Sequence, residues 1–80
     1  MAEPSDEAVV DAAYGAATRV VFSRLRASEV RDVDVSVSFE AGVLDVDVYV
    51  DAPDADVDLQ RVVDDAALAA RAAVDDLFAA

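Results

Sequence analysis

Cysteine and histidine are both absent from the 80-residue sequence. Without cysteine there are no disulfides, thiolate metal sites or cysteine nucleophiles, and without histidine the most common general base and zinc ligand are missing. Only two glycines occur, too few for a glycine-rich phosphate loop. No apolar run approaches the ~20 residues of a membrane span, and the first residues lack the basic start and apolar core of a signal peptide. We therefore expect a cytoplasmic protein with no membrane partner, no cofactor, no metal and no enzymatic activity.

Positively charged residues are also scarce. There are six arginines and no lysine against 18 Asp and Glu, which gives a formal net charge of -12. At 56% hydrophobic residues, the chain is too apolar for a disordered acidic tail. Acidic, lysine-free composition is typical of proteins from extreme halophiles, in which carboxylates maintain solubility in strong salt.

Nucleic acid is a disfavoured partner, because its phosphates are bound by clustered lysine and arginine. Four of the six arginines do fall between residues 19 and 31. They either complement the dipole at a helix end or form a weak RNA-binding module. The first interpretation is favoured.

The amino-terminal part of the sequence predicts a helix over residues 5–28. Ser5 can cap it, and acidic residues follow in its first turn. An apolar face recurs at helical spacing. Its members are Val10, Tyr14, Ala17, Val21 and Leu25, widened by Val9, Ala13 and Val20. Phe22 lies off this face, either under a loop or as an anchor for a partner.

A change to a period of two predicts two half-buried strands, over residues 33–39 and 44–50. Placing all apolar side chains on one face requires Phe39 to lie opposite Leu44. The connection is then of two or four residues, with Gly42 supplying any positive φ. Five aspartates share the outer face, where they either are simply solvated or bind a cation. They are Asp32, Asp34, Asp45, Asp47 and Asp51.

The remaining residues predict an alanine-rich helix over 56–79, capped by Asp54 or Asp56. Its expected packing face consists of Leu59, Val63, Ala66, Ala70, Ala73 and Leu77, with Ala67, Val74 and Phe78 to one side. Leu68 is expected to point nearly opposite this face. Asp54, Asp56 and Asp58 have the spacing of a calcium loop, but Leu59 occupies the position that requires glycine, so they are interpreted as caps and solubilising charges.

The order helix, strand, strand, helix predicts an α+β fold. We expect one two-layer αββα domain over residues 1–80, with both helices on one face of an antiparallel hairpin and with residues 1–4 flexible. A two-stranded sheet is marginally stable alone and leaves two unpaired edges. The domain is therefore expected to associate with another chain.

The sequence contains the hairpin VSVSFEAGVLDVDV (residues 35–48), followed by an Ala/Leu-rich helix that ends in AVDDLF (73–78). It resembles the small dimerising subunit of the archaeal KEOPS complex, which makes the threonylcarbamoyladenosine modification of tRNA. The chain is most similar to the short paralogues of that subunit, and it lacks the subunit's first strand. The resemblance implies a non-catalytic subunit that pairs with the related small subunit and docks on the transferase.

The resemblance also suggests where partner contacts would lie. The surplus apolar side chains are Phe22, Leu68, Val74 and Phe78. A small acidic homodimeric adaptor with an unrelated protein partner, and a weak RNA-binding module, are the alternatives.

Overall fold

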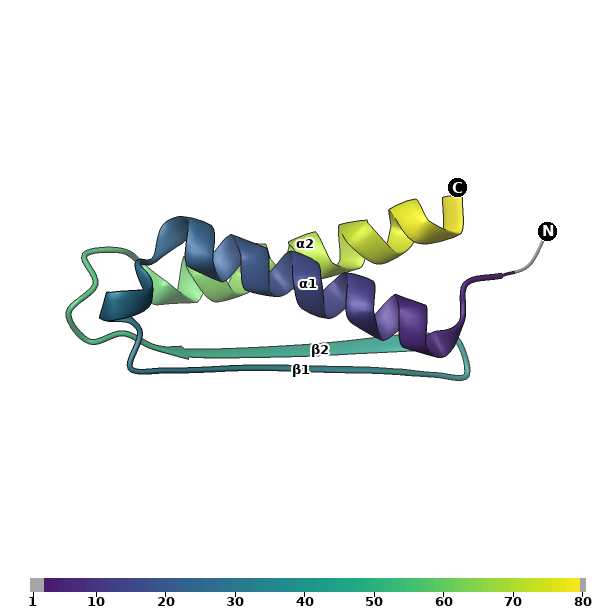
Figure 1. Ribbon diagram of the computed structural model, residues 1–80, viewed down its shortest axis with the longest axis horizontal. Coiled ribbons are helices and arrows are strands. Elements are labelled where there is room, and N and C mark those ends of the chain that lie inside the picture. The colour runs from purple at the N-terminus through teal and green to yellow at the C-terminus, as the bar shows by residue number, and fades with distance from the viewer. Residues whose placement is uncertain (1–2, 80) are drawn as a thin grey trace.

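The computed structural model describes residues 3–79 and shows a hairpin covered on one face by two helices (Figure 1). The elements in chain order are α1 (Asp6–Arg24), a 3₁₀ turn (Ala27–Glu29), β1 (Asp32–Glu40), β2 (Val43–Asp51) and α2 (Leu59–Ala79). The predicted α+β class and the placement of both helices on the hairpin are confirmed. Of the expected flexible segment 1–4, residues 1 and 2 lie outside the described residues.

Helix α1 begins where the sequence predicts it. The Ser5 hydroxyl accepts a hydrogen bond from the amide of Ala8 at 3.1 Å, and Asp6 and Glu7 supply negative charge in the first turn. The helix ends at Arg24, four residues earlier than expected. It stops there because the next residues form a separate 3₁₀ turn, in which the Glu29 carboxylate accepts a hydrogen bond from the Arg26 amide at 2.9 Å.

The hairpin has the predicted register. Phe39 lies opposite Leu44, and Val33 opposite Val50, so the alternating apolar side chains of residues 33–39 and 44–50 face the helices. Val43 and Tyr49 of β2 lie exposed on the outer face. The connection is the two-residue alternative, with Ala41 at φ 50° and Gly42 at φ 79°. Positive φ at both central residues is what a type I′ turn requires, and this turn matches the twist of the strands.

Helix α2 begins at Leu59, and its cap is neither of the aspartates predicted. The Asp58 carboxylate accepts hydrogen bonds from the amides of Gln60 at 3.1 Å and Arg61 at 3.4 Å. The prediction of Asp54 or Asp56 is wrong because residues 52–58 first pass through a turn. The buried methyl of Ala52 anchors this turn, and the amide of Ala55 donates to the Ala52 carbonyl at 3.1 Å.

The core lies between the two helices and the inner face of the sheet. Helix α1 packs against β1, α2 packs against β2, and the helices pack against each other most extensively. The buried side chains of the helices are Val9, Ala13, Ala17, Val21, Val62, Ala66, Ala70 and Val74. These small residues allow the two helix backbones to approach closely.

The predicted helix faces are each rotated from the real ones. In α1 the buried row runs through Val9, Ala13, Ala17 and Val21, whereas Tyr14 is half exposed. In α2 the row includes Val62 and Val74, and Leu59 and Leu77 only flank it. None of the helices described between residues 3 and 79 is long and apolar enough to cross a membrane.

Candidate interaction surface

Three of the four side chains predicted to contact a partner are exposed. Phe22 is 42% exposed, Phe78 45% and Leu68 64%, the last on the side of α2 that faces away from the sheet, as expected. Val74 is different, because it is only 6% exposed and belongs to the core. The description of Val74 as surplus apolar surface is therefore corrected.

The exposed predicted residues do not form one patch. Phe22 lies near the carboxyl end of α1, and Phe78 lies near the carboxyl end of α2. The two helices run in opposite directions along a molecule 47 Å long, so these ends are far apart (Figure 1). A partner that contacts both residues must extend along the whole domain.

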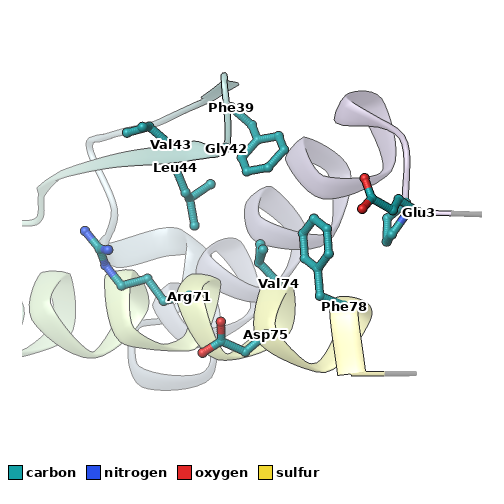
Figure 2. Close-up of a pocket in the computed structure, with 10 residues that line it drawn as sticks. Glu3, Phe39, Gly42, Val43, Leu44, Arg71, Val74, Asp75 and Phe78 are labelled. Carbon is teal, nitrogen blue, oxygen red and sulfur yellow. The ribbon is translucent and has the colours of Figure 1, made fainter.

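Phe78 also has a structural role that the sequence did not reveal. Its ring packs on that of Phe39, with ring centroids 6.0 Å apart and planes inclined by 45° (Figure 2). This pair closes the core at the turn end of the hairpin. Only part of the Phe78 side chain is therefore available to a partner.

A hollow of about 760 Å³ opens beside this aromatic pair, between the start of β2 and the last turns of α2. Leu44 and Phe39 line it from the hairpin, and Val74 and Phe78 line it from the helix (Figure 2). Its charged residues are Arg71, Glu3 and Asp75. One cation against two carboxylates does not favour a small anion, whereas the apolar walls suit an apolar side chain.

A second, smaller hollow of about 190 Å³ lies at the other end of β2. Val48 and Val50 line it from the strand, and Leu59 and Val63 line it from the first turns of α2. Both hollows are thus lined by β2 and α2, and the larger one also by Phe39 of β1 and by Glu3 and Pro4. The sequence pattern assigned the strand residues and Leu59 and Val63 to the core and Val74 and Phe78 to a partner contact, and it gave no signal for a hollow between β2 and α2.

The outer face of the sheet is open to solvent and acidic. Cross-strand pairing there mostly keeps carboxylates apart, because Asp45 lies opposite Ser38 and Asp47 opposite Ser36. No group of three or more acidic side chains with the geometry of a metal site occurs in the part of the chain that the structure describes.

One like-charged pair interrupts this pattern, since Asp32 lies opposite Asp51. The guanidinium of Arg31 offsets it by reaching the Asp51 carboxylate at 2.6 Å. Arg24 is also paired, with Asp65 of α2 at 2.7 Å. Two of the four arginines in the basic stretch are thus bound to carboxylates of the protein itself, which leaves less positive charge for phosphates.

The structure defines a class of protein, an open-faced two-layer α+β domain with helices on one side of a single hairpin. The chain belongs to the DUF3194 family, described as a protein family of unknown function, whose family model matches residues 2–77. The fold is shared with the solution structure of the hypothetical protein mth677 from Methanothermobacter thermautotrophicus. That match has a TM-score of 0.70 and 20% identity and covers 95% of this chain and 90% of the other.

The chain is also similar to an uncharacterized protein of Natronomonas pharaonis. The two are 49% identical over 42 residues, which is 52% of this chain and 51% of the relative. The chain therefore spans about half the length of the curated relative it matches.

Proposed function

We propose that this protein is a non-catalytic assembly subunit that supports threonylcarbamoyladenosine modification of tRNA. In this role it pairs with the related small subunit of the KEOPS complex, docks on the transferase subunit, and acts in the cytoplasm of a halophilic archaeon. Its contribution is to hold or regulate the complex, and the chemistry belongs to the transferase.

The observation that carries the proposal is the exposed apolar surface of so small a domain. Leu68 and Phe22 present large apolar side chains to solvent from helices whose buried faces are mostly alanine and valine. A domain of this size gains little stability from its own core, and these large exposed apolar side chains are candidates for a protein interface. A partner that covers these two side chains would remove their apolar surface from water, which would stabilise the complex.

The particular complex is supported by the resemblance of the hairpin and of the end of α2 to the small KEOPS subunits. The strongly acidic composition supports a cytoplasm of high salt. A homodimeric adaptor remains the second candidate, because another copy could cover the same apolar surface and the free edge of β1. An RNA-binding role is weaker, since Arg24 and Arg31 are engaged in ion pairs.

Affinity purification of the tagged protein from its own cells in multimolar salt, followed by mass spectrometry, tests the proposal. We expect the small subunit and the transferase in the eluate. Phe22→Asp and Leu68→Asp should reduce their recovery by more than about tenfold, because a buried unpaired carboxylate costs several kcal/mol.

Two neighbouring exposed positions provide controls of equal charge change. Ser23→Asp on α1 and Ala72→Asp on α2 should leave recovery unchanged, because both side chains are exposed and small. An eluate without either KEOPS protein would overturn the proposal. A dimer in light scattering of the purified chain, disrupted by the same two variants, would favour the homodimeric adaptor.

A further inference from the structure

We infer that the free edge of β2 accepts a β-strand from a partner protein, and that this strand alternates apolar with basic side chains. The inference deepens the proposed function, because it rests on the protein being a binding subunit and specifies the chemistry of its partner.

The edge of β2 has free backbone groups. In a two-residue hairpin the residues flanking the turn exchange hydrogen bonds, and such pairs alternate along the strands. Glu40 and Val43 flank this turn and lie opposite each other. Leu44, Val46, Val48 and Val50 therefore fall in the other type of pair, with their amides and carbonyls directed away from β1. Within residues 3–79 the sheet contains only these two strands, so no strand of the described chain uses those groups.

The space beside this edge has room for side chains. The two hollows lie at opposite ends of β2, beneath opposite ends of α2. Both have apolar walls made by inward-facing residues of β2, such as Leu44 and Val48, and by residues of α2, such as Val63 and Phe78. A strand added beside β2 would direct every second side chain toward α2, into these hollows. Those positions of the partner strand are therefore apolar.

The alternate side chains of an added strand would lie on the outer face. There they would stand next to Asp45 and Asp47, whose neighbours on the β1 side are the uncharged Ser38 and Ser36. The side of these aspartates that faces the free edge has no strand beside it. Opposite charges side by side on a sheet stabilise pairing, and like charges oppose it. Lysine or arginine is the residue that fits these positions.

The β2 strand of a second copy does not fit this edge. If β2 paired antiparallel with β2 of another copy, keeping both apolar faces inward, every register with substantial overlap would place aspartates opposite each other. Centred on Val46, Asp45 would face Asp47; centred on Asp47, that residue would face itself; and centred on Val48, Asp45 would face Asp51. The acidic residues thus act against self-pairing and toward a basic partner.

The edge of β1 is the less suitable one. The middle of its outer face carries Ser36 and Ser38, so a strand beside it would meet hydroxyls where β2 offers carboxylates. The smaller hollow lies wholly on the β2 side, and β1 contributes only Phe39 to the larger one. Both the carboxylates of the outer face and the position of the hollows therefore favour the edge of β2 over the edge of β1 as the binding edge.

Three synthetic peptides as long as β2 test the inference: one alternating lysine and valine, one alternating glutamate and valine, and one with the lysines and valines in separate blocks. Binding is measured by isothermal titration at the lowest salt concentration that keeps the protein folded, and contacts are mapped from amide shifts in NMR spectra. We expect the lysine–valine peptide to bind about tenfold or more tightly than either other peptide. The largest shifts should occur along β2, at Leu44, Val46, Val48 and Val50.

A pair of double variants separates strand pairing from general attraction between opposite charges. Asp45→Lys with Asp47→Lys on β2 should reverse the preference, so that the glutamate–valine peptide binds better. Asp34→Lys with Glu40→Lys on β1 makes the same change in net charge at exposed positions and should keep the original preference. Equal effects of the two double variants, equal binding of the alternating and block peptides, or shifts along β1 would each overturn the inference. Failure to recover KEOPS proteins from cells would defeat the proposed complex but would not alter these peptide results.

Discussion

Phe39, near the end of β1, and Phe78, in the last turns of α2, lie in contact with ring centroids 6.0 Å apart. The contact joins the turn end of the hairpin to the end of the chain's second helix. Most other contacts between helices and sheet involve valine and alanine, so this pair is the bulkiest link between the two layers at that end. It makes Phe78 a structural residue as well as a candidate contact for a partner.

The aromatic pair should be energetically coupled. We expect a double-mutant cycle of Phe39→Leu and Phe78→Leu, measured by chemical denaturation, to give a coupling free energy of about 0.5–1.5 kcal/mol. Leu68→Ala serves as the control, because its exposed side chain should change the unfolding free energy by less than about 0.5 kcal/mol. A coupling near zero would show that the two rings contribute independently.

The turn between the strands can be improved. Ala41 has φ 50°, a left-handed conformation that costs a residue with a Cβ about 1 kcal/mol, whereas asparagine tolerates it. Ala41→Asn should therefore raise the unfolding free energy by about 0.5–1 kcal/mol. Gly42→Ala should lower it by about 1 kcal/mol through the backbone alone, because no atom lies within 4 Å of the added Cβ. Thermal denaturation at fixed salt measures both, and a stabilising Gly42→Ala would contradict the turn type.

The cap of α2 is also testable. Asp58→Ala should lower the unfolding free energy by about 1 kcal/mol, since two amides of the first turn lose their acceptor. Asp54→Ala and Asp56→Ala are matched controls that remove the same charge from exposed positions without removing the cap. Equal losses of unfolding free energy for all three variants would mean that the removed charge, and not the lost cap, causes the destabilisation.

Stability should rise with salt. A net charge of -12 on 80 residues opposes the compact state by self-repulsion, which salt screens. We expect circular dichroism to show loss of structure in dilute buffer and its recovery in molar salt. Replacing Asp32, Asp34, Asp45 and Asp47 by asparagine should reduce this dependence. A thermal midpoint that does not move with salt would contradict the halophilic interpretation.

The hairpin was predictable residue by residue, and the helix faces were not. In the strands, apolar and acidic residues alternate so strictly that a shift of one residue would place Val37 opposite Asp45 on the wrong face. In the helices alanine occurs on every side, and its small apolar area distinguishes one face from another only weakly. The predicted face of α1 therefore included Tyr14, and that of α2 omitted Val62.

The interaction surface was predictable only in part. Exposure of Leu68 followed from its position opposite the packing face, but burial of Val74 depended on a helix rotation that the pattern did not determine. The gap between β2 and α2 depends on how far two packed elements stand apart. Such a distance is set by all the side chains between them and has no signature in any one segment.

The core made of valine and alanine has a consequence for temperature. Side chains such as Ala13, Ala17, Ala66 and Ala70, all fully buried, remove little apolar surface from water when the chain folds. The heat capacity change of unfolding scales with the apolar surface exposed, so it should be small for a chain of this length. A small heat capacity change flattens the dependence of stability on temperature, so calorimetry should find a shallower stability curve than a leucine- and phenylalanine-rich domain of the same length would give.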